Sequence, residues 1–169
     1  MLSNDGQDAR EIQLRTLIET MTEAMSAGDT SRLVECWSVP ALIIDGLEAV
    51  AVTTVRDAEV QCANAIEALR HRGDGSVVAR IEKFEPLANG LVSVDVVWIT
   101  PGNDPSTNIK RRYFARSADG VGVLRICVSA ALPATTPAAD PLSKALIDSF
   151  PASDPISAST PSNGKAANK

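Results

Sequence analysis

Four runs of alternating or β-branched residues follow one another between residues 76 and 131. They read SVVARIEKFEPLA, GLVSVDVVWIT, IKRRYFARSA and VGVLRICVSAAL, and the turn signals NG, PGNDPS and ADG separate them. Strands joined by such short connections pair antiparallel. We therefore predict one curved sheet with strands near residues 76–87, 90–100, 108–117 and 121–131.

Helices dominate the residues before this sheet. In EIQLRTLIETMTEAMSAGD the apolar residues recur with the spacing of one helical face: Leu14, Leu17, Ile18, Met21 and Met25. A similar stripe follows Thr54: Val55, Ala58, Cys62, Ile66 and Leu69. Gly28 suits a helix C-cap and Asp29 the next N-cap, and we expect Pro40 to end the short second helix. We predict helices near residues 8–27, 30–38 and 54–71.

A short hairpin is expected between the second and third helices. ALII and AVAV predict strands near 41–44 and 49–52, and Asp45-Gly46 is a strong turn signal. Asp45 has two interpretations. It is either a turn residue without further function, which we favour, or a carboxylate at the mouth of an apolar cavity that moves a proton.

These elements predict an α+β fold with three helices in the N-terminal half. The simplest packing lays the long first and third helices across the concave face of a curved antiparallel or mixed sheet, which leaves a cone with an open end. The order of elements, with SAGDTSRLVECW before Pro40, Thr53-Thr54 before the third helix and DG...LRI at the end, resembles the nuclear transport factor 2 (NTF2)-like superfamily. Its SnoaL-like and ketosteroid-isomerase-like branches are included in this resemblance.

The resemblance covers roughly residues 8–132 and implies a pocket domain that is often dimeric. It places Asp45 where the ketosteroid isomerases carry their general base. However, Met21 stands where those enzymes have an oxyanion-stabilising tyrosine, and Arg111 and Arg112 stand where they have a protonated aspartate. Without such donors a developing enolate lacks its main stabilisation, which argues against a steroid isomerase. His71, at a helix end, is interpreted as a solvated cation rather than as part of a His-Asp dyad.

Other side chains are candidates for lining a pocket, and Met21 and Trp37 are expected to surround Asp45 if it faces the cavity. Alternation places Arg111 and Tyr113 on one face of their strand, so that a single arginine inside the cone would anchor an anionic ligand. Trp37 and Trp98 are either core residues or ligand-binding surfaces. For Asp95 we favour a position on the solvent or dimer-interface side of the sheet over a buried acid with a raised pKa.

Composition narrows the function classes. The net charge of −5 and the pI near 4.9 argue against nucleic-acid and anionic-membrane partners. The three cysteines, Cys36, Cys62 and Cys127, lie far apart and are expected to be free thiols. Because the chain has one histidine, we expect no metal site and no other cofactor. The polar N-terminus contains no signal-peptide core, so we expect a cytoplasmic protein.

The predicted domain does not include the whole chain. We expect residues 1–7 to be flexible, and residues 133–169 to form a largely disordered tail, because six of the ten prolines fall there among Ala, Ser and Thr. DPLSKALIDSF could form a short helix at 141–150.

Three functions remain open from the sequence. The favoured one is a pocket protein that binds a small hydrophobic molecule, with no established activity. The alternatives are a SnoaL-like lyase or isomerase with Asp45 as general base, and a dimeric interaction module.

Overall fold

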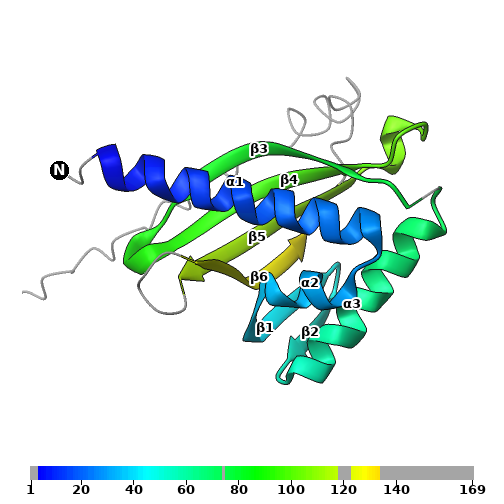
Figure 1. The fold of residues 1–169 in the computed structure, drawn as a ribbon, viewed down its shortest axis with the longest axis horizontal. Helices are drawn as coiled ribbons and strands as arrows, with labels where there is room; N and C mark the ends of the chain where they lie inside the picture. The colour runs from blue at the N-terminus through cyan, green and yellow to red at the C-terminus, as the bar shows by residue number, and fades with distance from the viewer. Residues whose placement is uncertain (1–3, 74, 118–122, 134–169) are drawn as a thin grey trace, which may run out of the picture. The chain divides into compact units, whose positions relative to one another are not determined.

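Six strands form one sheet, and three helices lie on its concave face (Figure 1). The computed structural model describes residues 4–73, 75–117 and 123–133. The helices are α1 (Asn4–Ala27), α2 (Thr30–Glu35) and α3 (Val55–Arg70). The strands are β1 (Trp37–Asp45), β2 (Glu48–Val52), β3 (Val78–Pro86), β4 (Leu91–Ile99), β5 (Ile109–Ser117) and β6 (Leu124–Ala131).

The sheet is mixed. Its strand order is β2-β1-β6-β5-β4-β3, and every neighbouring pair is antiparallel except β1 and β6, which run parallel. The four long strands pair in sequence order, as predicted from their short connections. The β1–β2 hairpin joins them only through the parallel pair, so it extends the sheet beyond β6 (Figure 1).

The core lies between the helices and the sheet. All five predicted core positions of α1 are buried, and so are four of the five in α3. Val55 is the exception, because it is the first residue of α3 and is 57% exposed. The helix-facing residues of β4 complete this core: Val92, Val94, Val96 and Trp98.

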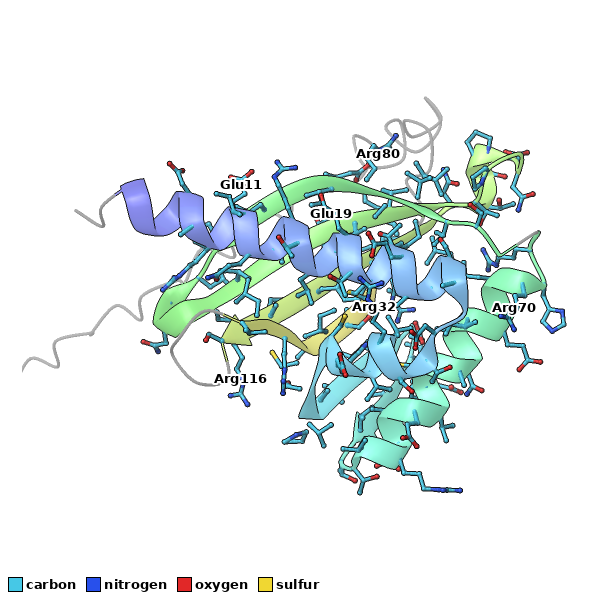
Figure 2. All side chains as sticks on the ribbon, viewed as in Figure 1. Glu11, Glu19, Arg32, Arg70, Arg80 and Arg116 are labelled. Atoms are coloured by element: carbon cyan, nitrogen blue, oxygen red, sulfur yellow. The ribbon has the colours of Figure 1, made fainter. Side chains whose placement is uncertain are left out.

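Capping side chains define where α2 and α3 begin. The Asp29 side chain accepts a hydrogen bond from the backbone N–H of Arg32 at 3.0 Å, and Thr54 and Asp57 form a reciprocal capping box. The backbone N–H groups of Thr54 and Thr53 donate to the Asp57 carboxylate, which lowers the pKa of Asp57. The turn between α1 and α2 is closely packed, since a Cβ on Gly28 would lie 2.1 Å from Arg70 Nη2. Figure 2 labels Arg70 at the end of α3.

The predicted end of the second helix was wrong. The helix ends at Glu35, and Trp37 is already the first residue of β1. The backbone N–H of Ile126 in β6 donates to the carbonyl of Cys36 at 2.9 Å, which draws the chain into the sheet. Pro40 is tolerated within β1 because β2 pairs only from Ala41, and the β1–β6 register shifts around it.

The ends of the chain are described only in part. Helix α1 begins at Asn4 and includes residues 4–7, which we expected to precede it. The predicted short helix at 141–150 and the rest of the tail from 134 onward lie outside the described residues. No helix among the described residues is long and apolar enough to span a membrane.

Asp95 lies on the sheet face opposite the helices, the side that we favoured, but it is buried rather than solvated. It is 8% exposed, and Arg112 on β5 donates to it through Nε and Nη2 at 2.7 and 2.8 Å. These charge-assisted hydrogen bonds lower the pKa of Asp95 below its ordinary value. The alternative of a buried acid with a raised pKa was therefore wrong, because burial comes with a bidentate partner.

Removal of this ion pair is expected to lower the stability of the fold by an amount that depends on pH. Asp95→Asn is expected to lower the free energy of unfolding by about 1.5–3 kcal/mol at pH 7, typical of hydrogen bonds to charged groups. A carboxylate with a lowered folded-state pKa contributes its stability above the unfolded pKa, which is about 4, and loses it as pH falls through the folded pKa. The difference from wild type should therefore shrink between pH 7 and pH 3 in urea denaturation.

The matched control is Glu11→Gln on α1, whose pair with Arg15 at 2.8 Å is exposed. It should change stability by less than about 0.5 kcal/mol. An Asp95→Asn loss as small as that of the control would contradict a stabilising role for the Asp95 pair.

Candidate functional site

A cavity of about 280 Å³ lies between the helices and the sheet. Helices contribute mainly apolar side chains to its wall: Met21, Met25, Leu33, Gln61, Cys62, Asn64, Ala65, Ala68 and Leu69. Strands contribute the remaining side chains: Trp37, Ile43, Asp45, Trp98, Ile109, Arg111, Tyr113 and Ser129. The cavity is therefore apolar over most of its wall, with polar groups concentrated on β1, β5 and β6.

Strand geometry positions these polar groups. Alternation along β5 turns Arg111 and Tyr113 toward the helices and their neighbour Arg112 toward the opposite face, as the sequence predicted. Ser129 on β6 is the cross-strand partner of Tyr113, and Ile43 on β1 is the partner of Ser129. Three strands thus present neighbouring side chains to one wall of the cavity.

The innermost polar contact joins Trp98 and Tyr113. The indole Nε1–H donates to Tyr113 Oη at 2.8 Å, and the two rings meet edge to face with centroids 6.3 Å apart. Tyr113 is only 4% exposed, and this burial raises its pKa to about 12. The phenol therefore stays protonated at neutral pH and can act as a hydrogen-bond donor.

Arg111 links the buried end of the cavity to its mouth. Its Nε donates to Ser129 Oγ at 2.8 Å, and its Nη2 donates to Asp45 Oδ1 at 2.6 Å. The exposed fraction of the side chain is 20% for Arg111 and 58% for Asp45. The polar groups thus run from a buried tyrosine, through a half-buried arginine, to an exposed carboxylate.

The two interpretations of Asp45 turn out not to exclude each other. Asp45 is the last residue of β1 and pairs with Glu48 across the two-residue loop Gly46-Leu47. The left-handed conformation of this loop falls on Gly46, with φ of 61°, and not on Asp45. Asp45 therefore flanks the turn, which begins one residue later than the Asp-Gly signal predicted, while its carboxylate also lines the cavity beside Arg111.

The six residues proposed from the sequence as catalytic or ligand-binding lie around this one cavity: Met21, Trp37, Asp45, Trp98, Arg111 and Tyr113. Sequence reasoning missed Ser129, Gln61 and Asn64. A serine within the apolar run RICVSAAL was the available signal for Ser129. His71 lies elsewhere, at the exposed end of α3.

The cavity contains few groups able to act chemically. Burial raises the pKa of the Cys62 thiol to about 12, so it is not a thiolate nucleophile at neutral pH. Asp45 Oδ1 accepts from Arg111, which leaves Oδ2 for a second partner. Among the described residues, no group of three or more His, Cys, Asp or Glu side chains is arranged to hold a metal ion.

The family model described as "NTF2-like protein (DUF6841)" matches residues 8–131. No curated protein matches the sequence.

Solved structures share the fold at low sequence identity. A domain of unknown function with a cystatin-like fold from Nostoc punctiforme PCC 73102 has a TM-score of 0.57 and 17% identity, over 84% of this chain and 87% of that one. An NTF2-like protein of unknown function from Shewanella oneidensis MR-1 has a TM-score of 0.58 and 12% identity, over 72% and 98%. A putative ketosteroid isomerase from Shewanella frigidimarina NCIMB 400 has a TM-score of 0.51 and 9% identity, over 69% and 92%.

The buried phenol gives a direct spectroscopic prediction, because the chain contains one tyrosine. Absorbance titration of the native protein should place the ionisation of Tyr113 near pH 12, about two units above the ordinary value of about 10. Since the folded state favours the neutral phenol, stability should fall as pH rises from 10 toward 12. In concentrated guanidinium chloride the midpoint should return to about 10. A midpoint near 10 in protein that keeps its near-ultraviolet circular dichroism would contradict the buried position.

Proposed function

This chain belongs to the DUF6841 family of NTF2-like proteins, and we propose that it binds a small hydrophobic molecule in the cavity between its helices and its sheet. The observation that supports the proposal is the composition of the cavity wall. It is mainly apolar on the helix side, where Gln61 and Asn64 of α3 are the polar exceptions, and it carries a few convergent polar groups on the strand side, which is the usual pattern of small-molecule sites.

The size of the cavity limits the ligand. Its volume of about 280 Å³ is slightly smaller than the roughly 300–1,000 Å³ typical of sites for drug-sized ligands. A compact ligand, such as a single substituted ring or a short branched chain, fits this volume better than a multi-ring compound. This limit is a further argument against a steroid.

A lyase or isomerase that uses Asp45 as general base is the second candidate. The observation in its favour is that Asp45 faces the same cavity as the hydroxyls of Tyr113 and Ser129. A base and hydrogen-bond donors around one space are the minimum needed to remove a proton next to a carbonyl group. Asp45→Asn would abolish such turnover while leaving the cavity intact.

We also propose that the sheet face opposite the helices forms a homodimer interface. Next to the charged Asp95 region, this face carries half-buried apolar side chains on β1, β5 and β6: Leu42, Ile44, Phe114, Val128 and Ala130. A two-fold symmetric pairing would cover this patch on both copies at once.

Ligand binding is tested by a thermal-shift screen of small hydrophobic acids, ketones and lactones. A compound that binds only the native state, at about 100 times its Kd, adds about 2.7 kcal/mol of stability and should raise the Tm by several degrees. Ala65→Trp, on the cavity-facing side of α3, should remove this shift by filling the cavity.

Ala63→Trp provides the control, because Ala63 is exposed on the same helix and does not line the cavity. Shifts that survive Ala65→Trp, or that Ala63→Trp removes equally, would place binding elsewhere.

The dimer is tested by light scattering coupled to size-exclusion chromatography. Wild type should have twice the mass of the chain, and Val128→Lys should produce monomer because it puts a charge in the apolar patch. Val60→Lys, at an exposed valine on α3, should leave the dimer unchanged. A monomeric wild type at micromolar concentration would refute the interface.

A further inference from the structure

Two buried hydroxyl groups in the cavity each accept a hydrogen bond from a group that can only donate. Tyr113 Oη accepts from the Trp98 indole, and Ser129 Oγ accepts from Arg111 Nε. Neither donor can accept in return, so each hydroxyl hydrogen needs another acceptor. Ser129 is the cross-strand partner of Tyr113, and an interaction between the two hydroxyls uses at most one of their hydrogens. Among the described residues the other hydroxyl hydrogen makes no hydrogen bond.

This unused donor lies in a buried place. Tyr113 is 4% exposed and Ser129 is 2% exposed, and both line the cavity. A buried donor without an acceptor is unfavourable, so protein sites that contain one commonly satisfy it with a ligand or an ordered water. The cavity floor therefore requires a molecule with an acceptor atom.

Arg111 is the fixed member of its ion pair with Asp45. It is half-buried and is held from inside by Ser129, whereas Asp45 is mostly exposed and stands beside the hairpin loop. Asp45 can turn into water at little cost, because it regains hydration there. The guanidinium would then be left facing the cavity without its carboxylate.

We propose that the cavity binds a small apolar carboxylic acid as its carboxylate, and that Asp45 occupies the position of that carboxylate in the unliganded protein. One ligand oxygen accepts from Arg111 Nη2 in place of Asp45. The other accepts the unused hydroxyl hydrogen of Tyr113 or Ser129, while the hydrocarbon part contacts the apolar wall. This inference rests on the proposed function and specifies its ligand class.

An anion fits these groups better than a neutral carbonyl compound. A ketone or amide oxygen would accept the hydroxyl hydrogen but would leave the Arg111–Asp45 pair unchanged. A carboxylate can accept from both the guanidinium of Arg111 and the free hydroxyl hydrogen. These two donors lie close together because Arg111 and Tyr113 both neighbour Ser129. Asp45 and Arg111 are the charged residues among those lining the cavity, so the site is neutral until Asp45 leaves.

The test compares matched acids and primary amides by isothermal titration calorimetry at pH 7. The probes are phenylacetate with phenylacetamide, and hexanoate with hexanamide. The proteins are wild type, Asp45→Asn, Arg111→Gln and the control Arg116→Gln. Arg116 is exposed on the same strand, so its substitution removes the same charge away from the cavity (Figure 2).

We expect wild type to bind at least one acid about tenfold or more tightly than its amide, because the charge-assisted bonds are lost in the amide. Asp45→Asn should tighten acid binding on the order of fivefold, since it weakens the internal competitor, and leave amide binding unchanged. Arg111→Gln should reduce the acid to the affinity of the amide. Arg116→Gln should retain the wild-type preference.

The failures of the two proposals are distinguishable. Amides that bind as tightly as acids, with no gain in Asp45→Asn, would overturn the carboxylate inference and leave the cavity as a site for neutral ligands. If none of the acids, amides, ketones or lactones binds, the proposed function fails and this inference fails with it. Amide binding by Arg111→Gln shows that the variant is folded, and Asp45→Asn tests the competition independently of that variant.

Discussion

The parallel pairing of β1 with β6 is the interaction on which the cavity depends. It places Ile43 beside Ser129, and it carries the end of β1 to the point where Asp45 meets Arg111, a residue 66 positions away in the sequence. Without this pairing the β1–β2 hairpin would have no hydrogen-bonded neighbour in the sheet. Asp45 would then be an ordinary turn-flanking residue far from any cavity.

The antiparallel pairing of β4, β5 and β6 explains how a polar network can exist within an apolar core. Each strand contributes one or two polar side chains from an otherwise apolar face, and each buried atom finds a donor or an acceptor on the next strand. Trp98, Tyr113, Ser129 and Arg111 are connected in this way from β4 through β5 to β6. The arrangement leaves one hydroxyl hydrogen unused, and this supports the proposal that the cavity binds a ligand.

Much of the fold could be predicted because its signals are local. Strand alternation correctly assigned Arg111 and Tyr113 to one face, and the Asp45-Gly46 signal correctly placed the hairpin. The end of the second helix could not be found in this way, because the Cys36 carbonyl is bound by a strand 90 residues further along, at Ile126. The burial of Asp95 could not be predicted either, since it depends on the bidentate partner Arg112 from β5.

Individual residues of the site could be predicted from the sequence, but the contacts between them could not. Apolar and aromatic candidates such as Met21 and Trp98 follow from periodicity, yet contact between Asp45 and Arg111 depends on the register of β1 against β6. No local pattern encodes that register. The role of Ser129 depends on the register of β6 against β5, which is why its polarity alone did not identify it.

The most direct test of the cavity as the functional site is a proton–nitrogen correlation spectrum of the two tryptophan indoles during ligand titration. Trp37 and Trp98 are the two tryptophans of the chain, and both line the cavity. The account predicts that both indole signals shift along one saturable curve as a small hydrophobic acid is added. Indole signals that stay fixed, while backbone signals from the opposite sheet face move, would contradict it.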